Sequence, residues 1–346
     1  MTDGSLSRRA LVMGSAALTA TAFNPPAFAA DRRNGARERT IYTHYRDMGP
    51  FPVKVANPLS FRIQEQSKDL LVRVTYPDPS APSRGETFPA ILFSHGGGAS
   101  KDLYVRLADH WAPHGYVVIL PTHFDSASLN YKIGSQDPFK YVSGRIGDLK
   151  FLLDHLGEVA EQTPALTGRL DAARIAVGGH SVGVLAALAL AGLRLKDARG
   201  RAVDFTDKRV RAIVSINGIG PLPMAGDDWS AVKLPVFAAG GTNDPGTATG
   251  GGLASWRWRL SPYLLTTGPD RYAVSIAGGD HDFGGLIAHD GETSKGDADG
   301  LVAVSALSTA FLDKELSNNS DARHLLQEGD IAALTQQHAF LESQIG

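Results

Sequence analysis

The sequence predicts an α/β fold with a mostly parallel central sheet and helices on both of its faces. Apolar runs of strand length alternate with amphipathic stretches of helical length through most of the chain. Two of the runs are bounded by Gly or Pro and are apolar throughout, which is typical of strands buried on both faces. No internal repeat is evident, so we expect residues 31–346 to form one domain.

The expected strands are short. The first alternates apolar and polar residues, as a strand does when only one of its faces is buried. Because helical stretches separate the strands, neighbouring strands are expected to run parallel. In chain order, we expect strands at Leu70–Tyr76, Ala90–Phe93, Tyr116–Leu120, Ile175–Gly178, Val210–Ile216, Val236–Ala239 and Tyr272–Ile276.

The expected helices are recognised by their apolar spacing. Arg145–Leu156, for example, carries Ile146, Leu149 and Leu153 on one face. Another helix is rich in Ala and Leu, as a buried helix is. The expected helices are Asp102–His114, Arg145–Leu156, Val182–Leu195, Leu301–Leu316 and Ile331–Gln344.

Three segments follow neither pattern. Residues 31–55 are charged and aperiodic, and we expect them to form an extended lead-in. Asp125–Ser143 is polar and aromatic, whereas Gly240–Pro262 is rich in Gly. Long irregular loops at strand ends often bind ligands, so we expect both loops to lie near a site. The sequence leaves open whether Gly240–Pro262 acts as a lid.

The composition excludes several classes of function. The net charge of −2 and the absence of a Lys/Arg cluster argue against nucleic acid or an anionic membrane surface as partner. The chain has no Cys, which excludes a thiol nucleophile, a zinc–thiolate site and disulfide bonds. The oligomeric state is left open.

The N-terminus has the order of a signal peptide. The adjacent Arg8 and Arg9 precede the apolar run Ala10–Phe23, and the small-x-small pattern Ala27–Ala29 follows. The apolar run is too short to span a bilayer of about 30 Å. We therefore expect residues 1–30 to be a twin-arginine signal peptide and the protein to be periplasmic or secreted. The alternative is an uncleaved amphipathic tail or anchor.

Residues Gly179–Gly183, with the pattern Gly-x-Ser-x-Gly, carry the main chemical signal. They follow the expected strand Ile175–Gly178 and open the expected helix Val182–Leu195. A serine at such a turn is held on a sharp elbow beside a helix N-terminus. This context predicts Ser181 as a nucleophile, against the alternative of a helix cap without chemistry.

An acid and a base follow two later strands. Asp244 comes just after Val236–Ala239, and His281 comes just after Tyr272–Ile276. Serine, acid, histidine is the chain order typical of this elbow. We expect His281 to take the serine proton and Asp244 to fix the tautomer of the ring. The alternative acids near the histidine are Asp270, Asp280, Asp282 and Asp290.

Two backbone amides are expected to form an oxyanion hole. One belongs to Val182, directly after the nucleophile, and the other belongs to Gly97, in the glycine run after Ala90–Phe93. Consecutive glycines allow the backbone to turn its amides toward a substrate oxygen. The alternative is a plain glycine turn.

Several motifs resemble one group of esterases. Phe93–Ala99 (Phe-Ser-His-Gly-Gly-Gly-Ala), Leu103-Tyr104, His114–Val118 and the elbow resemble the platelet-activating-factor acetylhydrolases. They are also similar to dienelactone-hydrolase-like esterases and secreted bacterial polyester hydrolases. The resemblance covers about residues 70–315 and implies the α/β-hydrolase fold, serine-esterase activity and Gly97 as the first oxyanion donor.

One position departs from the acetylhydrolases. They carry their acid one strand earlier, where this chain has Asn217. An amide cannot replace the carboxylate, so the acid must come from the later position, as in the polyester and dienelactone relatives. This departure weakens any transfer of phospholipid specificity.

Together these features predict a carboxylic-ester hydrolase that works through an acyl-enzyme, without a metal or other cofactor. The expected substrates are short- or medium-chain acyl esters, phospholipid-type esters or polyesters. An amidase or peptidase with the same triad and an inactive binding member of the fold are the alternatives. The expected substrate contacts, with loop packing as the alternative, are His123, Phe124, Tyr131, Trp256 and Trp258.

Overall fold

A computed structural model of the chain describes residues 32–78, 86–130, 137–225, 228–244, 246, 256–287 and 298–346. Its centre is a nine-stranded sheet in the order β1-β2-β4-β3-β5-β8-β9-β10-β11. Neighbouring strands from β4 to β10 in this order are parallel, and antiparallel pairs flank them at both edges. The predicted fold class, a mostly parallel sheet between helices, is confirmed.

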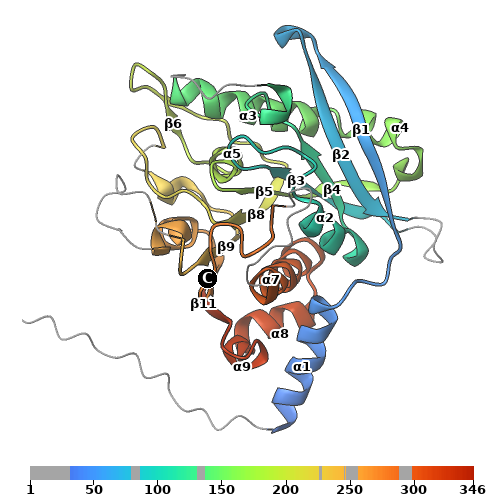
Figure 1. Cartoon of the computed structure of the whole chain (residues 1–346), viewed down its shortest axis with the longest axis vertical. Helices are drawn as coiled ribbons and strands as arrows, with labels where there is room; N and C mark the ends of the chain where they lie inside the picture. The colour runs from blue at the N-terminus through green and yellow to red at the C-terminus, as the bar shows by residue number, and fades with distance from the viewer. Residues whose placement is uncertain are drawn as a thin grey trace, which may run out of the picture.

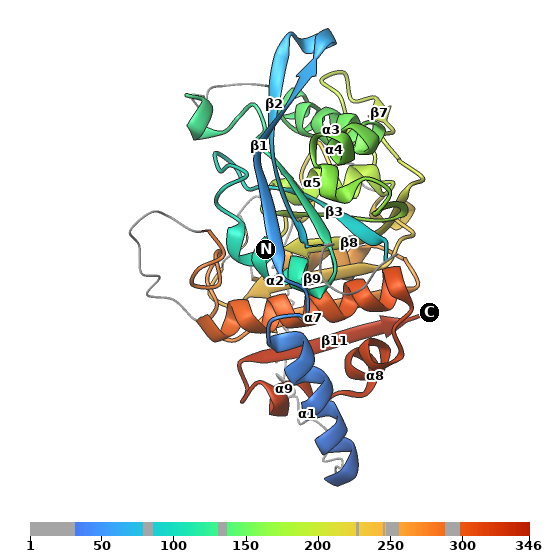
Figure 2. The ribbon, with the colours of Figure 1, turned by 90° about the vertical axis from the view of Figure 1, so that its right-hand side faces the viewer.

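Each strand expected from the sequence overlaps an observed strand, from β2 to β10. Two further strands, β1 and β11, form the edges of the sheet, and β1 pairs with β2 in a long hairpin that projects from the body (Figures 1 and 2). A separate two-stranded ribbon joins β6 to β7. The bounds are β1 Val53–Ile63, β2 Lys68–Pro77, β3 Phe88–Ser94, β4 Val117–Pro121, β5 Leu170–His180, β6 Leu195–Lys196, β7 Ala202–Val203, β8 Val210–Ile216, β9 Val236–Gly241, β10 Asp270–Ile276 and β11 Ala339–Ile345.

Helices cover both faces of the sheet (Figure 2). Helices α3, α4, α5 and α6 pack on one face, whereas α1, α2, α7 and α8 pack on the other. Along β3, Ala90 and Leu92 join the first layer, while Ile91 and Phe93 join the second. This double burial explains why that strand has no polar alternation. The helices are α1 Arg32–Arg46, α2 Val105–Trp111, α3 Pro138–Asp154, α4 Leu156–Gln162, α5 Gly183–Leu190, α6 Ser261–Leu265, α7 Ala298–Ser317, α8 Ser320–Glu328 and α9 Ile331–Leu334.

The expected extended lead-in over residues 31–55 is wrong in its first half. Arg32–Arg46 forms helix α1, which packs against α7 and α8. Ile41 and Tyr45 are buried there, and the Tyr45 hydroxyl donates a hydrogen bond to Asp313 on α7 (3.1 Å). The apolar stripe of this helix is narrow and most other positions are charged or polar, which hid its periodicity in the sequence.

The helix expected at Ile331–Gln344 is also wrong. Helix α9 ends at Leu334, and the chain then forms strand β11, antiparallel to β10. Gln336 and Gln337 have φ angles of 53° and 68°, in the left-handed region, which a right-handed helix cannot continue through. The short apolar run after them fits a strand as well as a helix, and pairing with β10 decides between the two.

The parallel strands β5, β8, β9 and β10 end at one edge of the sheet. Consequently the turns after His180, Ile216, Gly241 and Ile276 lie beside one another. This edge holds the candidate site, as is usual in parallel α/β sheets. Among the helices that the structure describes, none is long and apolar enough to cross a membrane. The expected signal peptide, residues 1–30, lies outside the described residues.

Candidate active site

Ser181 lies on a sharp turn between β5 and α5. Its φ of 53° is left-handed, whereas Val182 already has helical angles of −60° and −25°. This conformation costs a non-glycine residue about 1–3 kcal/mol, so the surroundings must hold it in place. The Ser181 amide donates to the Ile216 carbonyl at the end of β8 (3.1 Å). A Cβ on Gly183 would lie 2.1 Å from the Ser94 carbonyl oxygen, so only glycine fits beside the turn.

Asp244 and His281 are in direct contact at the same edge of the sheet. The ring Nδ1 of His281 lies 2.6 Å from Oδ2 of Asp244. A carboxylate only accepts hydrogen bonds, so Nδ1 carries the proton and Nε2 of the neutral ring is left as an acceptor. The Asp244 side chain is nearly buried, whereas 36% of the His281 side chain is exposed. The pair therefore combines a buried acid with an accessible basic nitrogen.

The turns that carry these two residues pack backbone to backbone. A Cβ on Gly241 would lie 2.2 Å from the Gly279 carbonyl oxygen, and the Asn243 amide donates to that oxygen (2.8 Å). Asn217, at the end of β8, donates from Nδ2 to the His281 carbonyl (2.8 Å). The three turns thus form one hydrogen-bonded unit that fixes the position of His281.

The elbow and the histidine turn also meet. The ring of His180, directly before Ser181, lies with its centroid 4.5 Å from that of His281. The His180 Nε2 lies 2.9 Å from the His281 carbonyl oxygen. The residue next to the elbow serine therefore contacts the histidine that keeps Nε2 as an acceptor, and the three predicted triad residues share one region.

The predicted oxyanion donors lie next to each other. A Cβ built on Gly97 would lie 3.8 Å from Cγ1 of Val182, so the glycine loop borders the elbow. Within the described part of the chain, neither of these two amides donates to a protein acceptor. The flanking amides are occupied: that of Gly96 donates to the Tyr104 hydroxyl (2.8 Å) and that of Gly98 to Asp125 (3.3 Å). The loop is thus anchored on both sides of the exposed residue Gly97.

The chain can be compared with known families through this fold and site. The model of the chlorophyllase family matches residues 49–220, a stretch that includes the glycine loop and the Ser181 elbow. The chain has the α/β-hydrolase fold. The match supports carboxylic-ester hydrolysis as the general class of activity for this α/β-hydrolase. A comparison with curated proteins finds no match. Asp244 and His281 lie beyond the matched stretch.

Arg259 is a second partner of Asp244 in this α/β-hydrolase. Its Nη2 donates to Oδ1 (2.9 Å), and its Nε lies 2.9 Å from Oδ2. The guanidinium also lies over the ring of Trp258, 5.2 Å from the ring centroid. Sequence reasoning missed this arginine, because the segment that carries it has no periodic pattern.

Arg145 supports the glycine loop from the interior of the protein. It is fully buried and donates to the carbonyl oxygens of His95 and Gly96 and to Asp125 (2.6 Å to the carboxylate). A sequence signal for this role existed. Arg145 and Asp148 fall on the same helical face as the apolar Leu149, a position where a charge is costly unless it is paired.

The structure does not support the expected substrate contact of His123. This residue is fully buried, and its ring bonds to Ser94 (2.9 Å) through Nε2 and to Asp148 (2.9 Å) through Nδ1. Its amide donates to His95. Burial lowers the pKa of His123, which favours the neutral ring. His123 therefore supports the loop from inside and does not face substrate.

The other expected substrate contacts fall in different places. Phe124 is half-buried and packs against Tyr141, whose hydroxyl lies 3.4 Å from a Cβ built on Gly97. This aromatic pair therefore borders the glycine loop that carries Gly97. Trp258 is buried beneath Arg259 and is a packing residue.

Trp256 does not join the triad residues. It lines a separate, largely apolar hollow of about 660 Å³ between the turn after β9, helix α9 and strand β11. Tyr131 lies outside the described residues, as do residues 245 and 247–255 of the loop considered as a lid.

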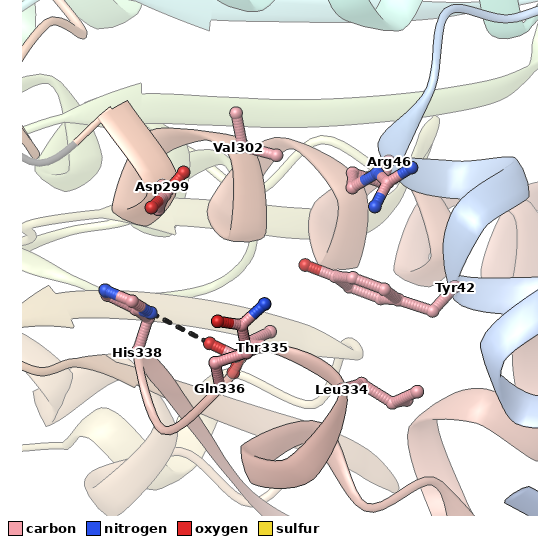
Figure 3. A pocket seen from close by; sticks show the side chains of 8 residues that line it. All are labelled: Tyr42, Arg46, Asp299, Val302, Leu334, Thr335, Gln336 and His338. Atoms are coloured by element: carbon pink, nitrogen blue, oxygen red, sulfur yellow. Dashed lines mark hydrogen bonds between the residues drawn. The ribbon is translucent and has the colours of Figure 1, made fainter.

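Other parts of the molecule offer less chemistry. Among the described residues, no group of three or more His, Asp and Glu side chains could hold a metal ion. A small polar hollow of about 130 Å³ lies between α1, α7 and the turn after α9 (Figure 3). It contains none of the triad or oxyanion residues.

Proposed function

We propose that this protein is a serine carboxylic-ester hydrolase. Ser181 attacks the ester carbonyl while His281 Nε2 takes its proton, and the tetrahedral oxyanion lies against the amides of Gly97 and Val182. Collapse of this intermediate expels the alcohol, which receives the proton from His281 and leaves an acyl-serine. Water, activated by the same histidine, then releases the acid and restores the serine.

The hydrogen bond between His281 Nδ1 and Asp244 Oδ2 is the observation that carries this proposal. It sets the tautomer in which Nε2 can accept a proton, and the half-exposed ring lies beside the strained serine turn. A buried carboxylate behind the ring stabilises the imidazolium that forms during attack. A simple helix cap would need none of these features.

The proposed substrates follow from the accessible site. Gly97 is exposed and His281 is partly exposed, so an ester carbonyl can reach both. We include short- and medium-chain acyl esters, phospholipid-type esters and polyesters. The name of the matched family adds chlorophyll as a test compound. We also propose export through a twin-arginine signal peptide, which N-terminal sequencing of periplasmic or secreted protein would test by locating cleavage near Ala29.

A labelling experiment tests the nucleophile and a substrate panel tests the reaction. A fluorophosphonate should label the wild-type protein at Ser181 and should not label Ser181→Ala. Undiminished labelling of the variant would refute the assignment. The panel compares p-nitrophenyl esters of increasing chain length with matched anilides, an oxidised phospholipid, a polyester film and chlorophyll. Equal turnover of esters and anilides would count against an esterase.

A further inference from the structure

A chain of hydrogen bonds connects the oxyanion loop to the histidine turn through Tyr104 and His180. The Gly96 amide donates to the Tyr104 hydroxyl oxygen (2.8 Å). The same hydroxyl lies 2.8 Å from Nδ1 of His180, and Nε2 of His180 lies 2.9 Å from the carbonyl oxygen of His281. Tyr104 and His180 are both buried, so water cannot replace these bonds without cost.

The direction of each bond in this chain is fixed by its ends. A carbonyl oxygen only accepts, so His180 Nε2 must carry a proton and donate to His281. In the neutral ring, Nδ1 is then an acceptor, and the Tyr104 hydroxyl must donate to it. The hydroxyl oxygen remains free to accept from the Gly96 amide. One consistent arrangement of protons therefore runs from Gly96 to His281.

The surroundings of His180 favour this neutral form. Burial, with a second contribution from the charge of His281, lowers the pKa of His180 to about 3. Among the described residues, the charged or titratable groups near the ring come from four segments. They are His95 from the loop after β3, Tyr104 directly before α2, Asp282 and His281 from the turn after β10, and Arg259 from the segment before α6. The Asp282 carboxylate is 3.9 Å from Nε2, beyond hydrogen-bond distance.

We infer that Tyr104 and His180 are positioning residues that couple the oxyanion loop to the proposed base. This inference rests on the proposed function. The transition state needs the Gly97 amide and His281 Nε2 in register with Ser181 at the same moment, and errors of about 0.5 Å already weaken such sites. The chain of hydrogen bonds joins Gly96, directly before Gly97, to the carbonyl of His281. It passes through His180, directly before Ser181.

Substitutions can break this chain of hydrogen bonds at either end. Tyr104→Phe removes only the hydroxyl, and so releases the Gly96 amide and His180 Nδ1. In His180→Asn, the side-chain amide takes the former position of Nδ1, and the side chain is too short to reach the His281 carbonyl. His180→Gln places a donor near Nε2 and keeps that bond. Tyr116→Phe is the matched control, because it also removes a buried tyrosine hydroxyl, one that donates to Asp313 on α7.

The coupling predicts a specific pattern of kinetics with a p-nitrophenyl ester, at a temperature where circular dichroism shows each variant folded. Tyr104→Phe and His180→Asn should each lower kcat by about tenfold, less than the 10²–10³ for losing an oxyanion donor, with KM within about twofold. Tyr116→Phe should keep its kcat. His180→Gln keeps the bond to the His281 carbonyl but loses the acceptor for the Tyr104 hydroxyl, so its kcat should fall about as far as that of Tyr104→Phe. Because the chain acts as a unit, Tyr104→Phe/His180→Asn should be no slower than the slower single variant by more than about twofold. Losses that multiply in the double variant, or wild-type kcat in Tyr104→Phe, His180→Asn or His180→Gln, would overturn the inference.

A second readout does not depend on activity. Nitrogen NMR of the labelled His180 imidazole should show the neutral, Nε2-protonated tautomer at every pH from 8 to 5. A proton on Nδ1 or a charged ring would overturn the hydrogen-bond chain. If the NMR result is as expected but the wild-type protein hydrolyses no ester, the proposed function is wrong and the chain of hydrogen bonds is still supported.

Discussion

Arg259 and Asp244 form an ion pair behind His281, and the carboxylate of Asp244 serves both of them. Arg259 Nη2 donates to Oδ1 at 2.9 Å while His281 Nδ1 lies 2.6 Å from Oδ2. Both partners of the ion pair are largely buried. The arginine therefore compensates a buried negative charge and holds its orientation toward the histidine.

Removing this arginine should affect both stability and activity. We expect Arg259→Ala to destabilise the protein by about 3 kcal/mol, since breaking one side of a buried pair leaves the other charge unpaired. With Asp244 less well oriented, kcat should fall by about tenfold or more. Urea unfolding and steady-state ester hydrolysis measure the two effects.

The matched control for this variant is Arg257→Ala. Arg257 is also stacked on a tryptophan and also pairs with a carboxylate, Glu342, but that pair is more than one-third exposed. An exposed pair contributes about 0–1 kcal/mol, so Arg257→Ala should stay close to wild type. If the two variants behave alike, the special role of Arg259 is wrong.

The assignment of the acid can be tested by an isosteric change. In Asp244→Asn, the amide can donate to His281 Nδ1 and so favours the tautomer in which Nε2 carries the proton and cannot act as a base. We expect kcat to fall by about 10³–10⁴-fold with little change in KM. Steady-state kinetics on a p-nitrophenyl ester measures this loss.

Asp280→Asn is the control for this change, because Asp280 is a rival acid that directly precedes the histidine. Its Oδ1 accepts from the amides of Asp282 and Gly284, and an asparagine oxygen can do the same. This variant should keep kcat within about threefold of wild type, as expected for a change that preserves hydrogen bonds. A severe loss in Asp280→Asn with a mild one in Asp244→Asn would exchange the two assignments.

The sequence was sufficient to place Asp244 and His281 in contact, because both follow parallel strands that end at one edge of the sheet. Apolar patterns, which each strand carries locally, also predicted the central strands of the sheet, but not their order. The buried polar network was not predictable in the same way. Arg259 and Tyr104 meet their partners through contacts between distant segments, and no local periodicity marks them.

The errors of sequence reasoning have the same origin. His123 was expected to contact substrate because it follows a strand and opens an irregular loop. It points inward because Asp148, on the buried face of α3, provides a partner for its ring. Similarly, β11 forms because β10 offers it an edge, which the sequence of β11 alone does not reveal.

Ser94, His123 and Asp148 form a second Ser–His–Asp array with hydrogen bonds of 2.9 Å at each step. All three residues are buried. A hydroxyl that substrate cannot reach cannot act as a nucleophile, so we expect this array to be structural. Ser94→Ala should keep fluorophosphonate labelling at Ser181 and lose about 1–2 kcal/mol of stability, because the ring of His123 loses a buried partner.

Peptide mapping of the labelled protein and urea unfolding check both halves of this prediction. The comparison with Ser181→Ala is informative, since that variant should lose labelling while its stability changes little. Label found on Ser94, or labelling abolished in a folded Ser94→Ala protein, would contradict the assignment of roles to the two arrays.

Acid should destabilise the fold well before its carboxylates titrate. Burial is the main cause that lowers the pKa of His180 to about 3 and that of His110 to about 4. A histidine in the unfolded chain has a pKa of about 6.5. Below pH 6.5 the unfolded chain therefore binds protons that the native state does not. The stability is fully present above that pH and declines as the pH falls toward the native values, by up to about 1.4 kcal/mol per pH unit for each histidine. Urea unfolding between pH 7.5 and 5 should show this slope.

His110→Gln keeps a side-chain donor for the Tyr45 carbonyl that His110 now bonds. It should remove the contribution of His110 to the slope, which is up to about 1.4 kcal/mol per pH unit. Identical slopes in the variant and the wild type would show that His110 is protonated in the native state as readily as in the unfolded one.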